Sequence, residues 1–297
     1  MNITQTSPGL VVNILGPDGS GKSTLAKSLA AKLREDGATT TLCRWSDIVN
    51  GRLSTDESLC TLLRELYVEA WRALYIGATD DRSRRLLQAP PDFAGFRAAG
   101  LESEAPNQPV GATTSGMTAS ALLEFVADVL IAAQVVRPLV QAGHVVVADS
   151  SGIKNVGKVL SVAGALGNDM PSQFVGLLRT AVLDAYRSSF LTPEIGIVLN
   201  VDPEVCRRRR LSQRGRVGPV EDLAFAGRTD DSFVELQRDM LDQYLRVAAE
   251  STSWHVIDAT DLTPEELVDH AAALVQGVLT GRCEQPSAVG TATRGAQ

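Results

Sequence analysis

A glycine-rich segment near the N-terminus, Gly16-Pro17-Asp18-Gly19-Ser20-Gly21-Lys22-Ser23, restricts the fold more than any other part of the chain. It matches the pattern G-x-x-x-x-G-K-[ST]. The apolar run Leu10–Leu15 precedes it and has the character of a buried parallel strand. Apolar residues at helical spacing follow it over 23–34, and Gly37 marks the end of that helix. A glycine-rich turn between a buried strand and a helix predicts a phosphate-binding loop.

The residue types in this loop suit phosphate groups. Glycines let backbone N–H groups converge on phosphate oxygens without Cβ clashes, and the following helix directs its positive end to the same place. In such a loop Lys22 reaches the β- and γ-phosphates of ATP, and the Ser23 hydroxyl binds Mg²⁺. We therefore predict ATP and Mg²⁺ as cofactors; the alternative is a chance glycine-rich turn. The predicted nucleotide-binding residues are Gly16, Asp18, Gly19, Ser20, Gly21, Lys22, Ser23 and Thr24.

Two aspartates are candidates for roles beside this loop. Asp149 ends the apolar run 144–149, so it would reach the carboxyl edge of a parallel sheet and join Ser23 as a metal ligand. The alternative for Asp149 is a helix cap or a turn. Asp18 lies inside the loop, where it would approach the attacking group or orient a ligand. Its alternative is a turn-forming role beside Gly19.

A cluster of arginines follows the segment Asp202-Pro203-Glu204. On a helix, Arg207, Arg210 and Arg214 share one face, at spacings of three and four. We predict a lid over 207–230 whose arginines fold onto the transferred phosphoryl group and act with Lys22 and Asp18 in catalysis. The alternative is a solvated basic face that pairs with Glu221 and Asp222. The arginines of the cluster are Arg207, Arg208, Arg209, Arg210, Arg214 and Arg216.

Strand and helix patterns alternate along the chain, which predicts an α/β fold with a parallel sheet and helices on both faces. The predicted strands are 10–15, 39–43, 144–149, 195–201 and 254–258. The predicted helices are 23–34, 59–75, 121–141, 154–166, 172–190 and 264–279. We expect one domain over 1–280 and a disordered tail over 281–297. Residues 78–118 are rich in small and polar residues and proline, and we predict a mobile insertion there without secondary structure.

Charge and cysteine usage exclude several classes of protein. The net charge of −7 gives no basic footprint for nucleic acid. We find no uninterrupted apolar run that spans a bilayer and no basic segment typical of a signal peptide, so we expect a cytoplasmic protein without membrane contact. Cys43, Cys60, Cys206 and Cys283 lie without metal-binding spacing, which favours reduced thiols over disulfides or a zinc site.

The order of these parts resembles the thymidylate kinase branch of the nucleoside monophosphate kinases. The glycine-rich loop is similar to that family's phosphate loop, and residues 122–150 resemble its central helix and following strand. Residues 201–215 resemble its lid, and 230–260 resemble its C-terminal helix and last strand. The resemblance implies a P-loop NTPase fold with a five-stranded parallel sheet and transfer of the ATP γ-phosphate to an acceptor. It also implies a homodimer formed through helix 121–141, for which the alternative is a buried core helix with the same pattern.

The segments that hold the phosphate acceptor in that family differ in this chain. Ser150 and Ser151 follow Asp149 where the family has Arg-Tyr, and Asp128 precedes Val129 where it has Asp-Arg. Of the family's Arg-Glu-Pro-Gly segment only Arg44 is retained. We therefore expect a nucleotide, nucleoside or related acceptor other than thymidine monophosphate. The predicted acceptor-binding residues are Arg44, Trp45, Tyr67, Trp71 and Lys154.

Each acceptor residue has a plainer interpretation. Tyr67, Trp71 and Tyr75 recur on one helix face, where they stack on a flat acceptor or simply form core. Lys154 replaces a lost arginine or lies on the surface. Two other functions stay open: an authentic thymidylate kinase, and a nucleotide-binding regulatory or scaffold protein that transfers nothing. The sequence has no Asn-Lys-x-Asp element, which argues against a GTPase.

Overall fold

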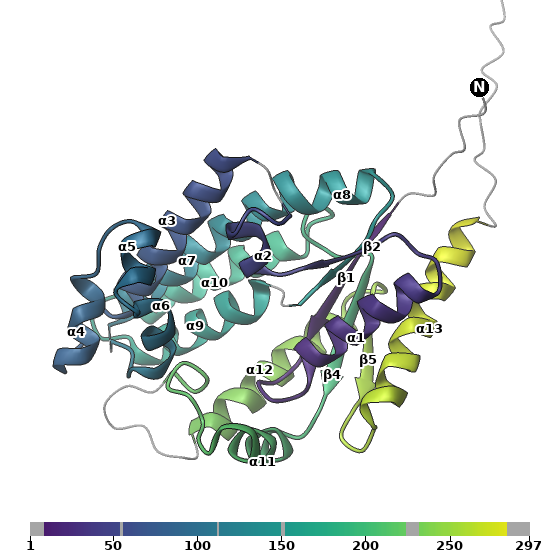
Figure 1. The fold of residues 1–297 in the computed structure, drawn as a ribbon. Helices are drawn as coiled ribbons and strands as arrows, with labels where there is room; N and C mark the ends of the chain where they lie inside the picture. The colour runs from purple at the N-terminus through teal and green to yellow at the C-terminus, as the bar shows by residue number, and fades with distance from the viewer. Residues whose placement is uncertain (1–8, 54–55, 112, 150–151, 224–231, 284–297) are drawn as a thin grey trace, which may run out of the picture.

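The protein is built on one parallel β-sheet (Figure 1). The computed structural model describes residues 9–53, 56–111, 113–149, 152–223 and 232–283. Within them, five parallel strands pair in the order β2-β3-β1-β4-β5. The strands are β1 (Leu10–Leu15), β2 (Thr40–Cys43), β3 (Val145–Ala148), β4 (Ile195–Asn200) and β5 (Trp254–Asp258). The predicted α/β class, with an all-parallel sheet flanked by helices, is confirmed.

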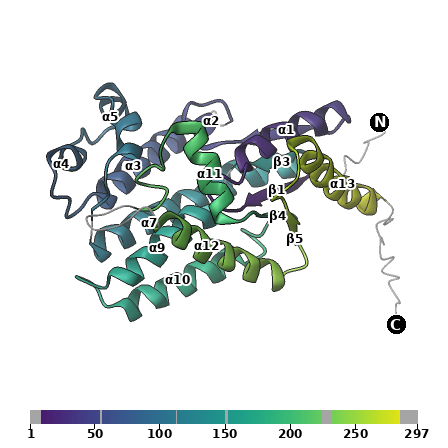
Figure 2. The ribbon, with the colours of Figure 1, turned by 90° about the horizontal axis from the view of Figure 1, so that it is seen from below.

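Both faces of the sheet are covered, because alternate apolar residues of each central strand enter different clusters. In β1, Leu10, Val12 and Ile14 belong to one buried cluster, while Leu15 belongs to the other. Helices α1 (Lys22–Glu35) and α13 (Pro264–Cys283) pack together over the first cluster (Figure 2). Residues of α3 (Glu57–Leu74), α7 (Thr114–Ile131), α9 (Gly152–Leu166) and α10 (Ser172–Tyr186) enter the second cluster on the opposite face.

The central helix is longer than predicted and is interrupted. Helix α7 begins at Thr114, where the Thr113 hydroxyl accepts a hydrogen bond from the Gly116 N–H. It passes through a π-helical segment, Ala132–Val136, into α8 (Arg137–Gln141). Pro138 offers no N–H to the preceding turn, which is a common cause of such interruptions.

The expectation of no membrane-spanning run needs correction at this helix. By length and composition, the stretch Thr114–Gln141 is apolar enough to cross a bilayer. The core helix of a soluble protein passes the same test. Here α7 packs between α3 and α9, and its Met117 and Ala121 are fully buried, but only 22% of the most apolar window of this stretch is buried inside the structure.

The prediction that residues 78–118 lack secondary structure is wrong. The segment contains α4 (Asp81–Leu87), α5 (Phe93–Ala98), α6 (Leu101–Glu104), a 3₁₀ turn (Ala105–Asn107) and the start of α7. Asp80 and Asp92 cap α4 and α5, and Leu86 and Phe96 are fully buried in the core. The helices are too short for a periodic pattern, so only their caps marked them in the sequence.

Tyr75 ties this segment to α3. Its hydroxyl donates a hydrogen bond to the carbonyl oxygen of Ala105 and lies 3.2 Å from that of Gln108, and the side chain is fully buried. Tyr75 is therefore a core residue and not part of an acceptor pocket. We expect Tyr75→Phe to lower the free energy of unfolding by about 1–2 kcal/mol, because it leaves the buried carbonyls without this donor. Urea unfolding measures the loss, and an unchanged midpoint would contradict the tether.

Two of the remaining helices follow the carboxyl ends of β2 and β4, and the third packs against β4 and β5. They are α2 (Trp45–Val49), α11 (Pro203–Arg214) and α12 (Ser232–Ala249). The predicted lid over 207–230 begins within α11, and its residues 224–230 lie outside the described residues. Residues 281–283 continue α13, so the predicted tail does not begin at 281. Residues 284–297 lie outside the described residues.

Candidate phosphate cradle and acceptor cavity

The glycine-rich loop connects β1 to α1, as predicted, and it is packed tightly on its neighbours. Gly16 and Gly19 have φ angles of 151° and 92°. A Cβ on Gly16 would lie 2.9 Å from the Leu199 carbonyl oxygen, and one on Gly19 would lie 2.7 Å from that of Cys206. Larger residues therefore fit at neither position, for reasons of both backbone conformation and space. The loop is held between the end of β4 and the first turns of α11.

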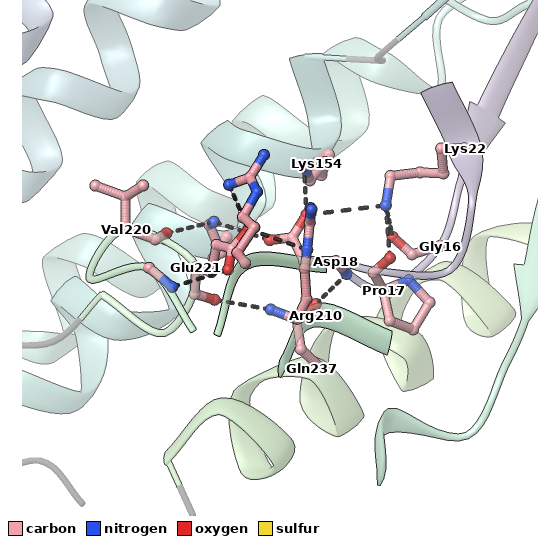
Figure 3. Close-up of polar contacts among 12 residues, drawn as sticks. Gly16, Pro17, Asp18, Lys22, Lys154, Arg210, Val220, Glu221 and Gln237 are labelled. Atoms are coloured by element: carbon pink, nitrogen blue, oxygen red, sulfur yellow. Dashed lines mark hydrogen bonds and ion pairs between the residues drawn. The ribbon is translucent and has the colours of Figure 1, made fainter. Parts of the chain in front are cut away.

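The Lys22 ammonium is turned into this loop. Its Nζ donates to the carbonyl oxygens of Gly16 at 2.8 Å and Pro17 at 2.6 Å, and lies 3.9 Å from Asp18 Oδ1 (Figure 3). Burial, followed by repulsion from Lys154, lowers the pKa of Lys22 to about 7. A phosphate oxygen would be a better partner for this amine than neutral carbonyls, because it carries the opposite charge.

Asp18 is the acidic centre of a buried cluster of lysines. Its carboxylate lies 2.6 Å from Lys154 Nζ and 3.4 Å from Lys158 Nζ, both on α9, and only 4% of its side chain is exposed. The Asp18 N–H donates to Gln237 Oε1 at 2.7 Å. Burial alone would raise the pKa of Asp18, but the lysines outweigh it and hold that pKa well below its usual range.

The arginines of α11 do not act as one group. Arg210 and Arg214 both pair with Glu221 Oε1, at 3.1 and 3.5 Å, while Arg207 lies 4.0 Å from Glu204. The Glu221 pairing is what the alternative interpretation predicted. Arg210 nevertheless touches the loop, since its Cγ lies 3.2 Å from the Cβ position of Gly19. Arg214 is 60% exposed and is held less firmly.

The predicted metal ligands follow adjacent strands. Ser23 lies in the first turn of α1, after β1, and Asp149 follows β3, the neighbour of β1. The Asp149 Oδ1 atom and the Ser20 hydroxyl are buried without a hydrogen-bond partner among the described residues. A buried carboxylate oxygen without a donor fits a cation ligand, so the donor set suits Mg²⁺.

A cavity of about 360 Å³ borders α9, the helix that carries the cradle lysines Lys154 and Lys158. It is enclosed by β1, α3, α7 and the end of α10, on the sheet face opposite α1. The predicted acceptor residues Trp45, Tyr67 and Trp71 line it, with ring centroids of Trp45 and Tyr67 5.5 Å apart and stacked. Pockets of this size and aromatic character are typical of small-molecule sites.

Two predicted acceptor residues are not part of the cavity lining. Arg44 caps α2 and holds Asp47, with Nε and Oδ2 2.7 Å apart. Lys154 holds Asp18 and so belongs to the phosphate cradle instead. Both cations are thus engaged by carboxylates, and their contact with an acceptor stays a prediction.

Sequence reasoning missed the polar residues of the cavity. Glu124 and Asp128 lie one turn apart on α7 and both line it. The Tyr186 hydroxyl donates a hydrogen bond to Asp128, and Asn155 of α9 lines the cavity together with Glu124. Burial raises the pKa of each carboxyl to about 7. The sequence signal that could have indicated these cavity residues is a pair of acids four positions apart on an otherwise apolar helix.

Comparison with known proteins finds no matching family model and no matching curated protein. The resemblance described above therefore depends on the quoted residues and motifs.

Proposed function

We propose that the chain is an ATP-dependent phosphotransferase of the thymidylate kinase type, built on a P-loop NTPase fold. It transfers the γ-phosphate of ATP to a nucleotide, nucleoside or related small molecule other than thymidine monophosphate. The observation that carries the proposal is the glycine loop between β1 and α1, with the Lys22 amine turned inward. The aromatic cavity beside it supports a separate acceptor site.

Each part of the cradle has a role in this proposal. Backbone N–H groups of the loop and the first turn of α1 bind the phosphates, and Lys22 exchanges its carbonyl partners for phosphate oxygens. Arg210 lies against the loop and supplies further positive charge on release from Glu221. Ser23 and Asp149 would hold Mg²⁺, which neutralises charge on the β- and γ-phosphates when bound.

The acceptor enters the cavity and stacks on its aromatic side chains. Stacking on flat side chains orients a ring without demanding a particular hydrogen-bond pattern. Orientation of the acceptor next to the γ-phosphate is the main contribution that a protein makes to this reaction.

Isothermal titration calorimetry with the non-hydrolysable analogue AMP-PNP and Mg²⁺ tests the donor site. We expect saturable binding by the natural protein and at least a tenfold loss of affinity in Lys22→Ala, which loses a charge-assisted contact. Lys27→Ala, on the exposed side of the same helix, is the matched control and should bind normally. Absence of binding by the natural protein, or equal affinity in both variants, would refute the proposal.

A further inference from the structure

The charges around the cavity differ from those of the cradle. Among the described residues that line it, Arg137 is the one cation. Its guanidinium is already engaged, because Nη2 donates to the carbonyl oxygens of Ser189 and Phe190 at 2.8 and 2.6 Å. A second nitrogen, Nη1, lies 3.5 Å from Glu194. Among the described lining residues, a phosphate group in the cavity would meet the carboxylates of Glu124 and Asp128 and no uncommitted cation.

Glu124 lines the cavity together with Asn155 of α9, the helix that also carries the cradle lysines Lys154 and Lys158. It interacts electrostatically with both lysines. The same two lysines hold Asp18 of the phosphate loop. Their charge is therefore directed to the donor side, where the γ-phosphate would lie.

Asp128 occupies a more enclosed position. It accepts the Tyr186 hydrogen bond, and it packs so closely on Gly152 that a Cβ there would overlap its carboxylate. No lysine contributes to its electrostatic surroundings, unlike those of Glu124. Of the two acids, Glu124 is the one placed to meet an acceptor atom that faces the cradle.

We propose that the acceptor is a flat, unphosphorylated molecule with a hydroxyl group, either uncharged or cationic, and that the Glu124 carboxylate accepts the proton of that hydroxyl. The inference rests on the proposed phosphotransferase function and assigns its acceptor class. Aromatic faces attract both neutral rings and cations, whereas two carboxylates repel a phosphate. A base whose pKa lies near neutral pH, as burial gives Glu124, is well matched to this proton transfer.

The step balances as a simple displacement. The acceptor oxygen forms a bond to the γ-phosphorus while the bond from that phosphorus to the β–γ bridging oxygen breaks. The bridging oxygen leaves with the electron pair as part of ADP. The hydroxyl proton passes to Glu124 and then to solvent, so the products are a phosphate monoester, ADP and one proton.

Fluorescence binding tests the charge preference of the cavity. The chain has three tryptophans, so Trp254→Phe leaves only Trp45 and Trp71, which both line the cavity. In this background we titrate nucleosides, their 5′-monophosphates, and tyramine as a flat cationic probe. We expect at least one unphosphorylated compound to bind, at least tenfold more tightly than its phosphorylated counterpart. Equal or tighter binding of the monophosphates, or binding by none of the compounds, would overturn the inference.

Kinetics of Glu124→Gln tests the proton transfer, with the compound that binds most tightly as acceptor. We expect kcat to fall about a hundredfold while KM changes little, since glutamine keeps the shape and loses the base. The rise of kcat/KM with pH up to about 7 should disappear in Glu124→Gln and persist in Asp128→Asn. Glu65→Gln, exposed on α3, is the matched control.

The two proposals fail separately. If Glu124→Gln reacted at the full rate and bound AMP-PNP normally, Glu124 would not be the base, but the phosphotransferase proposal would still stand. Loss of AMP-PNP binding by the natural protein would remove the phosphotransferase itself.

Discussion

Asp18→Asn should lower the free energy of unfolding by about 3 kcal/mol at pH 7, because it leaves buried lysines without their acidic partner. Lys22, Lys154 and Lys158 lie within 3.9, 2.6 and 3.4 Å of this carboxylate. Asparagine has nearly the same shape and still offers an oxygen, so the effect isolates the charge. The three ammonium groups then repel one another in a region from which water is largely excluded.

The pH at which Asp18 stabilises the folded protein follows from the direction in which its pKa is shifted. Because that pKa is held well below its ordinary value, the stability it contributes is present above the ordinary value of 3.8 and is lost only as pH falls further. At pH 7 the contribution is complete. Urea unfolding at pH 7 therefore measures the full difference between the two proteins.

An exposed pair provides the control for Asp18→Asn. Asp269 lies 3.1 Å from Lys32 but its side chain is 66% exposed, so Asp269→Asn should cost about 0.5 kcal/mol or less. Inorganic phosphate or ATP should restore much of the lost stability of Asp18→Asn, since either anion binds the released lysines. Equal losses in the two variants, or no response to phosphate, would show that the lysine cluster is not an anion site.

The strands and the loop were predictable from the sequence because their signals are local. Buried parallel strands are largely continuous apolar runs, and 10–15 was predicted with the bounds that the structure has. The glycine loop has a fixed spacing and fixed flanking elements. By contrast, α4 and α5 are 7 and 6 residues long, shorter than the window in which helical periodicity is detected.

The missing parts of the site could not be predicted because they depend on long-range contacts. Lys158 and Asp18 are separated by 140 residues, and nothing local in α9 marks Lys158 as a partner of the loop. Tyr186 and Asp128, separated by 58 residues, meet only because the end of α10 reaches α7. The aromatic side chains were predicted for the cavity because helical spacing brings Tyr67 and Trp71 to one face. Tyr75 shares that spacing yet lies in the core, so periodicity alone did not separate the two roles.

The acids of the cavity predict an unusual dependence of stability on pH. The pKa of Glu124 rises from 4.5 to about 7, and that of Asp128 rises from 3.8 to about 7, in both cases chiefly through burial. The folded state therefore binds these protons more tightly than the unfolded state does. Stability from these groups is complete below the ordinary pKa values and is lost as pH rises through about 7. We expect the free energy of unfolding to fall by about 2 kcal/mol for each of these carboxyls as pH rises from 5 to 7.

The neighbours of Glu124 and Asp128 lower the pKa values of these acids, but by less than burial raises them. Lys158, Lys154 and Asn155 of α9 favour the Glu124 carboxylate, and Tyr186 of α10 favours that of Asp128. Asp18 and Lys22 change the free energy of unfolding little between pH 5 and 7. The pKa of Asp18 lies below this range, and that of Lys22 lies at its upper end. The two cavity acids should therefore dominate the change.

Urea unfolding of the natural protein and of Glu124→Gln/Asp128→Asn, each at pH 5, 6 and 7, measures the contribution of the cavity acids. The amide at position 128 still accepts the Tyr186 hydrogen bond, and neither amide titrates, so the double variant should lose most of the pH dependence. It should also be the more stable protein at pH 7, because it carries no buried carboxylates there. Glu65→Gln should keep the pH dependence of the natural protein. If the natural protein were instead more stable at pH 7 than at pH 5, the two carboxylates would be solvated or paired in the folded state, and burial would not raise their pKa values.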